Sequence, residues 1–133
     1  MTGRAQIEEL MRELYANRLR GDLPAVCRSF SADAEFRIVS SGQASPIAIT
    51  ARGIDEFRPL LELLIKAFRL SDLTILFMSI DGVRAAVYWQ ANVRSKITGG
   101  TVPTEMIDLV EVSDGRIVNF REFAVPRSIP AQR

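Results

Sequence analysis

Apolar side chains recur with a helical period in the first half of this chain and with a strand period in the second half. Over residues 5–20 they return every three or four positions, which predicts an amphipathic helix with the stripe Ile7, Leu10, Met11, Leu14 and Arg18. Tyr15 lies at the edge of this stripe. Gly21 ends the helix, and the cap and proline of residues 22–24 begin a second, short helix that reaches about Ser31.

The rest of the chain predicts a first strand, a third helix and then an antiparallel meander. The strand covers residues 34–40, and a connection containing Gly, Ser and Pro leads to a short apolar segment at 47–50. The helix begins near Gly53 and tolerates Pro59, because amides of the first turn have no helical partner. Strands joined by glycine-containing hairpin turns follow near residues 73–80, 84–97, 102–112 and 116–125.

The order of these elements predicts one α+β domain over residues 1–133. A chain of this length buries roughly two thirds of its unfolded surface, which is enough for a hydrophobic core. The content of 47% hydrophobic and 25% charged residues is typical of an ordinary globular protein. No internal repeat or linker divides the sequence.

The composition excludes several kinds of chemistry. The chain has no histidine and a single cysteine, Cys27, so an internal disulfide, a His-based metal site and an imidazole-activated nucleophile are ruled out. We expect no metal and no cofactor, and we assign any catalysis to Asp, Glu, Tyr, Arg or Lys. The net charge is +1 and the basic residues form no stripe, so nucleic acid is not an expected partner. No segment is predicted to span or enter a membrane, which favours a cytoplasmic location.

Four segments carry a resemblance to a known superfamily through their order and spacing. They cover residues 15–23, 30–36, 53–57 and 113–123. With them the chain resembles the superfamily of nuclear transport factor 2, ketosteroid isomerase and the SnoaL-like polyketide cyclases. The resemblance extends over nearly the whole chain. It implies a cone in which a curved antiparallel or mixed sheet wraps around three helices from the first half of the chain.

The resemblance also implies candidate catalytic residues. In ketosteroid isomerases, a tyrosine on the first helix and a protonated aspartic acid on a late strand donate hydrogen bonds to a developing oxyanion. Asp108 matches that aspartic acid, and Tyr15 matches the tyrosine approximately. The isomerase's proton-shuttling aspartate falls on Ile38, and the last catalytic aspartate of limonene-type epoxide hydrolases falls on Val125. Neither aliphatic residue can accept a proton.

An inward-facing sheet surface is predicted to form a pocket. Residues 87–94 alternate between apolar and polar side chains, so one face of this strand is drier and Trp89 points inward. By resemblance, Asp108 and Glu122 lie on the same inner face. Desolvation and a like-charged neighbour raise a carboxyl pKa, so one acid would stay protonated and donate while the other accepts. The candidate ligand contacts are Trp89, Phe36, Ile38, Ala91 and Phe120.

Each candidate also has a purely structural interpretation. In that alternative, Asp108 pairs with Arg94 or Arg121, and Glu122 faces solvent after a β-bulge. In the same alternative, Tyr15 and Trp89 pack their rings in the core. Cys27 is interpreted as a buried, inert thiol.

The strand that carries Asp108 also predicts self-association. If Asp108 points inward, an apolar outer face remains, and such a face usually meets a partner. We expect a homodimer packed sheet to sheet, as is common in the superfamily, through Tyr88, Ile107, Leu109 and Phe123. The opposite strand register would place Ile107 and Leu109 in the cavity and Asp108 in the interface.

These features predict a pocket for a small, largely apolar metabolite with one or two polar groups, such as a ketone, lactone or aromatic compound. An enzyme of this kind would catalyse isomerisation, cyclisation or hydration without a cofactor. Asp108 and Tyr15 would stabilise developing negative charge, and Glu122 would move the proton. The alternatives are a ligand-binding protein without catalysis and a dimerisation module whose pocket is filled by side chains.

Overall fold

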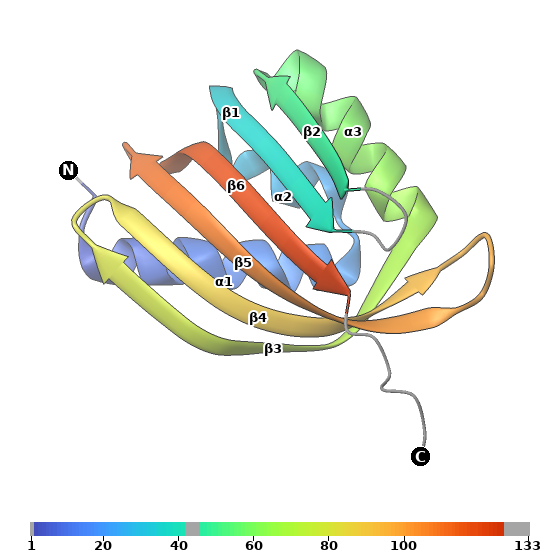
Figure 1. The fold of residues 1–133 in the computed structure, drawn as a ribbon. Coiled ribbons are helices and arrows are strands. Elements are labelled where there is room, and N and C mark those ends of the chain that lie inside the picture. The colour runs from blue at the N-terminus through green and yellow to red at the C-terminus, as the bar shows by residue number, and fades with distance from the viewer. Residues whose placement is uncertain (1, 42–45, 127–133) are drawn as a thin grey trace.

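The computed structural model describes residues 2–41 and 46–126 and has the predicted α+β architecture (Figure 1). The helices within these ranges are α1 (Arg4–Arg20), α2 (Leu23–Arg28) and α3 (Ile54–Ala67). The strands are β1 (Phe30–Ser41), β2 (Pro46–Arg52), β3 (Phe68–Asp81), β4 (Arg84–Ser95), β5 (Thr101–Ser113) and β6 (Arg116–Pro126). None of the described helices is long and apolar enough to cross a membrane.

The structure shifts several element boundaries from the sequence prediction, and β-pairing explains two of these shifts. α2 ends at Arg28 instead of Ser31, because the Ile117 amide donates to the Ser29 carbonyl and Phe30 already pairs with Ile117 in β6. β3 begins at Phe68, directly after α3, because Phe68 pairs with Ser95 of β4. Sheet hydrogen bonds therefore extend both strands into residues whose local pattern favours helix or loop.

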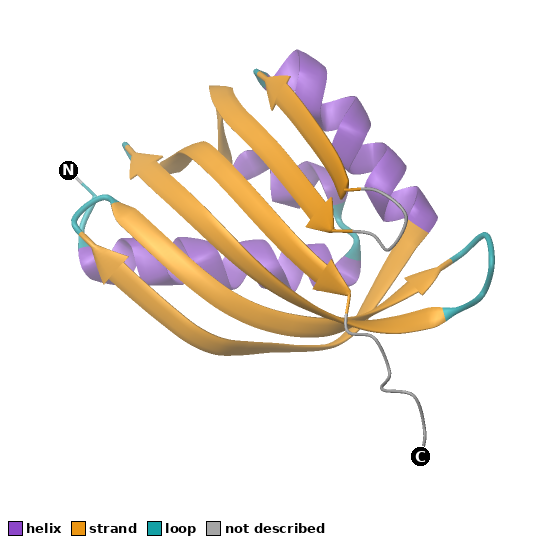
Figure 2. Ribbon diagram, in the orientation of Figure 1, coloured by secondary structure: helices purple, strands orange, loops and turns teal. Residues whose placement is uncertain are grey.

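The six described strands form one mixed sheet in the order β2-β1-β6-β5-β4-β3. β1 and β6 are parallel, whereas the other neighbouring strands are antiparallel. All three helices lie on the same face of this curved, unclosed sheet (Figure 2). The parallel pair places the first and last of the described strands side by side within the sheet.

Irregularities in β3 account for part of the curvature. The pairing of β3 with β4 shifts register between Ser71 and Thr74 and again between Ile75 and Phe77. An extra residue in one strand bends that strand and increases its twist. β3 therefore curves around α1 while remaining paired with β4 along its length.

The predicted hairpin turns are present at their glycines. Asp114 and Gly115 have φ values of +51° and +75° and connect the paired residues Ser113 and Arg116. Positive φ at both central positions is the geometry of the tight hairpin turn that Asp-Gly favours. The β5–β6 register, and with it the facing of the inner side chains, is anchored by this turn.

The core lies between the helices and the inner face of the sheet. The predicted α1 stripe is buried there through Ile7, Met11, Leu14 and Tyr15. A second part of the core is a cluster of aromatic rings with centroids 5.2 to 6.0 Å apart, formed by Phe30, Phe36, Phe57 and Phe120. These rings join β1, α3 and β6, and three of them, Phe30, Phe36 and Phe120, also line the cavity described below.

Candidate functional site

Asp108 lies on the inner face of the sheet and is fully buried. Along β5, Met106, Asp108 and Val110 are buried, whereas Ile107 and Leu109 are 45% and 43% exposed. The chain thus adopts the register in which the acid points inward and its apolar neighbours point outward. In the sheet, Asp108 is flanked by Val87 of β4 and Glu122 of β6.

Two donors from different elements converge on one oxygen of Asp108. The Tyr15 hydroxyl on α1 donates to Oδ2 at 2.5 Å, and the Trp89 indole Nε1 on β4 donates to the same oxygen at 2.9 Å. The two rings also contact each other, with centroids 5.1 Å apart. The other carboxyl oxygen, Oδ1, is buried and receives no hydrogen bond from the described residues. Oδ1 is therefore the oxygen that is available to carry a proton.

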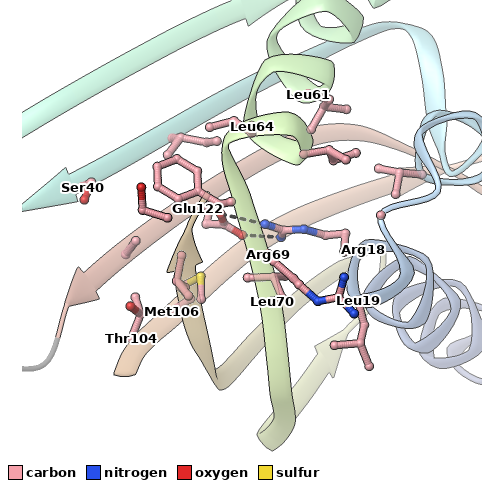
Figure 3. Close-up of a pocket in the computed structure, with 18 of the residues that line it drawn as sticks. Arg18, Leu19, Ser40, Leu61, Leu64, Arg69, Leu70, Thr104, Met106 and Glu122 are labelled. Carbon is pink, nitrogen blue, oxygen red and sulfur yellow. Dashed lines mark hydrogen bonds and ion pairs between the residues drawn. The ribbon is translucent and has the colours of Figure 1, made fainter. Parts of the chain in front are cut away.

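Glu122 is buried beside Asp108 and is held by Arg18 of α1. Arg18 Nη1 lies 2.5 Å from Glu122 Oε2, and Nη2 lies 3.2 Å from Oε1, which makes the ion pair bidentate (Figure 3). The same guanidinium is 3.9 Å from Asp108 Oδ2 and lies 5.0 Å from the centre of the Trp89 ring. One cation thus serves both acids and packs over an aromatic face.

The structure does not pair Asp108 with the arginines that the structural interpretation favoured. Arg94 and Arg121 are exposed, and neither forms an ion pair with Asp108 within the described residues. Arg121 points away because it is adjacent to Glu122 in β6, and neighbouring residues of a strand face opposite sides. The cation comes instead from α1.

Arg18 is the site residue that sequence reasoning did not select. Its signal was present, because a charged residue in an otherwise apolar helical stripe must find a partner when that stripe is buried. The side chain is only 18% exposed, so the helix places its guanidinium inside the protein. The sequence pattern showed that Arg18 faces the sheet but did not show which acid it meets.

The environments of the two acids separate their pKa values. Burial, and then the negative charge of Glu122, raise the pKa of Asp108 well above its ordinary value. Burial also opposes ionisation of Glu122, but the charge and hydrogen bonds of Arg18 outweigh it and lower the pKa of Glu122. Asp108 is therefore the member of the pair that keeps its proton more readily, and Glu122 is the member that ionises. Burial, followed by Asp108, raises the pKa of Tyr15, which stays a donor.

A cavity of about 810 Å³ opens between the helices and the inner face of the sheet. Most of its wall is apolar, and the Arg18–Glu122 ion pair forms part of it (Figure 3). Of the candidate ligand contacts, Phe36, Ile38 and Phe120 line the cavity. Trp89 and Ala91 do not line it, and neither do Asp108 and Tyr15, although all four are buried on the inner side. Glu122 is thus the predicted catalytic residue that reaches the cavity, and Asp108 lies behind it.

Metal ligands do not gather at this site. In residues 2–41 and 46–126, no group of three or more Asp, Glu or Cys side chains is arranged to hold a metal ion. Cys27 is buried, and burial raises the pKa of its thiol. A protonated buried thiol is a poor nucleophile, which agrees with the structural interpretation of this residue.

The outer face of the sheet carries the apolar side chains that were predicted to meet a partner. Ile107, Leu109 and Phe123 are exposed there, and Phe123 pairs with Ile107 across β5 and β6. Tyr88 is half-buried beside them and donates a hydrogen bond to Glu105. The inward position of Asp108 and the outward position of these side chains follow from the same strand register.

Comparisons with known proteins agree with this geometry. A family model described as a SnoaL-like domain matches residues 2–120. No curated relative matches the sequence. A solved candidate isomerase from Bacillus subtilis is 21% identical, with a TM-score of 0.78 over 90% of this chain and 86% of that chain. An LEH-like epoxide hydrolase of M. tuberculosis is 16% identical, with a TM-score of 0.70 over 90% of this chain and 83% of that chain. A SnoaL-like polyketide cyclase candidate from Mesorhizobium loti is 19% identical, with a TM-score of 0.64 over 87% and 97%. At these identities, the likeness shows a shared fold.

Proposed function

The chain belongs to the SnoaL-like domain family, and from that premise we propose that it binds a small, largely apolar carbonyl compound and transfers a proton on it. The reaction class is cofactor-free isomerisation or cyclisation. The supporting observation is the pair of adjacent buried carboxyl groups whose pKa values are driven apart, with the ionised member facing an apolar cavity. Such a division assigns one group as acid and the other as base.

The position of Glu122 supports its role as the base. In the parallel pairing of β1 and β6, Glu122 lies directly beside Ile38. Ile38 occupies the place at which the resembled ketosteroid isomerases carry their proton-shuttling aspartate. A carboxylate on the neighbouring strand therefore reaches the same part of the cavity. In this proposal Glu122 therefore replaces the aspartate that the resembled isomerases have at the place of Ile38.

Each polar group has a role in the proposed step. Glu122 removes a proton from the carbon next to the substrate carbonyl, and the electron pair moves into the enolate. The charge that develops on the carbonyl oxygen faces Arg18, which has N–H donors beyond the two that bind Glu122. Return of the proton to another carbon completes an isomerisation. The lowered pKa of Glu122 makes it a weak base, so the substrate proton must itself be acidic.

Asp108 and Tyr15 act one layer behind the cavity in this proposal. In this proposal the protonated Asp108 lies beside Glu122 in the sheet and is held in place by Tyr15 and Trp89. Asp108 and Tyr15 then affect the reacting atoms only through Glu122. This assignment differs from direct donation to the substrate oxyanion, because neither residue lines the cavity.

A ligand-binding protein without catalysis is the second candidate function. The observation that favours it is the bidentate ion pair, because a carboxylate already neutralised by Arg18 is a good hydrogen-bond acceptor and a weak base. The size of the cavity supports either of these functions over a module whose pocket is filled by side chains.

Replacement of Glu122 by Gln is expected to separate the two functions. With a β,γ-unsaturated cyclic ketone as the test substrate, we expect E122Q to lower the rate of conversion to the conjugated ketone by about 100-fold or more. Absorbance of the conjugated product measures the rate, and calorimetry measures binding. The control is E62Q, which makes the same change at an exposed glutamate outside the cavity. Binding without turnover in the unmodified protein would favour the second candidate, and equal rates in E122Q and E62Q would exclude Glu122 as the base.

We also propose that the outer sheet face pairs two copies of the chain. Exposed apolar side chains that are contiguous on one face of a sheet typically mark an interface. Light scattering at micromolar concentration is expected to show a dimer. The double variant L109K/F123K is expected to be monomeric, because two charges would be buried against a second copy. A monomer in the unmodified protein would contradict this proposal.

A further inference from the structure

The charged residues that line the cavity are almost all basic. Among the described lining residues, the acid is Glu122, whereas the basic ones are Arg18, Arg20, Arg69 and Lys96. The Arg18 charge is taken up by Glu122. The three other cations therefore give the cavity an uncompensated positive charge, although the net charge of the whole chain is only +1.

These three outer cations, Arg20, Arg69 and Lys96, have no acidic partner within the described residues. None of them has a carboxylate within ion-pair distance, and all three are exposed. Arg20 donates to the Asn17 side chain, and Lys96 Nζ donates to the Ile65 carbonyl at 3.0 Å. Both contacts are with neutral groups, so the charges remain available to an anion.

The fold brings the outer cations to one end of the cavity. Arg20 is in the last turn of α1, and Gly21 next to it packs near Ile65, since a Cβ there would lie 3.5 Å from Ile65 Cγ2. Lys96 follows β4 and binds the carbonyl of that same Ile65. Arg69 is the second residue of β3, and its side chain extends toward Leu19 at the end of α1 (Figure 3).

The lining of the cavity has three components. These are the buried Arg18–Glu122 ion pair, a mostly apolar wall, and the exposed cations near the ends of α1 and α3. A ligand that matches all three components has a polar group, an apolar body and an anion. We propose that the substrate of this site is an amphiphilic oxyanion, an apolar molecule with a terminal carboxylate or phosphate that the outer cations bind. This inference rests on the proposed function, because it assigns the ligand of the same cavity.

The test compares ligands that share an apolar body and differ at one end. Binding of dodecanoate, dodecyl phosphate and the neutral methyl dodecanoate is measured by calorimetry at low ionic strength. We expect either anion to bind about tenfold or more tightly than the ester, and the preference to shrink as salt screens the charges. The anion that binds with the higher affinity shows whether the site prefers a carboxylate or a phosphate.

The variant R69Q/K96Q removes two of the cations and keeps donors at both positions. We expect it to lower anion affinity about tenfold and to leave the affinity for the ester unchanged. The matched control is R84Q/R116Q, which removes two exposed cations from the hairpin-turn end of the sheet. An equal loss for ester and anion, or an equal loss in the control, would overturn the proposal.

The outcomes distinguish failure of this inference from failure of the proposed function. If the ester binds as tightly as the anions, the cavity is a ligand site and the anion inference is wrong. If no ligand of the three binds, both are contradicted. Thermal unfolding of each variant shows whether it is folded. The substituted residues are exposed in both double variants, so their unfolding temperatures are expected to lie close to that of the unmodified protein.

Discussion

Replacement of Arg18 by Met is expected to lower the free energy of unfolding by about 3 to 5 kcal/mol at neutral pH. Arg18 is the cation that neutralises Glu122, whose side chain is 5% exposed, and it also lies 3.9 Å from Asp108. Methionine fills a similar volume but leaves the Glu122 carboxylate buried without its counter-charge. Removal of one partner from a buried pair costs far more than the pair contributes as a whole. Urea unfolding followed by circular dichroism measures the change.

Two further variants show whether this loss comes from the ion pair. R12M changes another arginine of α1, whose side chain is 57% exposed and paired with Glu8, and it is expected to cost less than about 1 kcal/mol. The double variant R18M/E122Q removes the stranded charge and is expected to recover much of the stability lost in R18M. If R18M costs no more than R12M, Glu122 is not held as an ionised group in the folded protein.

Replacement of Asp108 by Asn is expected to stabilise the protein at neutral pH, which is unusual for a fully buried polar residue. The amide oxygen of Asn accepts from Tyr15 and Trp89 as Oδ2 does, and its NH₂ group takes the place of Oδ1, which has no hydrogen-bond partner among the described residues. The unfolded Asp108 is ionised above pH of about 4, so folding must add a proton to it. D108N avoids that cost.

The pH dependence of this effect has a defined sign. The pKa of Asp108 is raised in the folded state, by burial first and by Glu122 second. Between the ordinary carboxyl pKa of about 4 and the raised value, the folded state binds one more proton than the unfolded state. As pH rises through that window, the free energy of unfolding of the unmodified protein therefore falls relative to that of D108N, by up to about 1.4 kcal/mol for each pH unit. Urea unfolding of both proteins from pH 4 to pH 8 measures the difference between their free energies of unfolding. The contributions of the other titrating groups cancel in this difference.

The variant D108A is the contrast for this prediction. Alanine leaves the buried donors of Tyr15 and Trp89 without an acceptor, at a cost of about 1 to 3 kcal/mol for each. We therefore expect D108N to be more stable and D108A to be less stable than the unmodified protein at neutral pH. A D108N protein that loses stability as pH rises, relative to the unmodified protein, would mean that Asp108 is ionised when folded.

The amino-acid pattern predicted most of the elements because their signals are local. The stripe from Ile7 to Arg18 specifies which side of α1 is buried, and the Asp-Gly pair at 114–115 specifies a tight hairpin turn. The inner face of β4 followed from strict alternation around Trp89. The family resemblance added what alternation alone leaves open, namely that Asp108 and Glu122 lie on that same face. The sheet that the resemblance implied is confirmed by the structure.

The fold class, the helical stripe, the turns and the two candidate acids could thus be predicted from the amino-acid pattern and the resemblance it carries. The pairing of Arg18 with Glu122, the position of Asp108 behind Glu122, and the presence of Arg20, Arg69 and Lys96 in the cavity lining could not be predicted in this way. Periodicity reports which side of an element is buried, whereas an ion pair depends on how far one element is shifted along another. In this fold, the parallel pairing of β1 with β6 and the packing of α1 against the curved sheet bring together residues that are far apart in the chain.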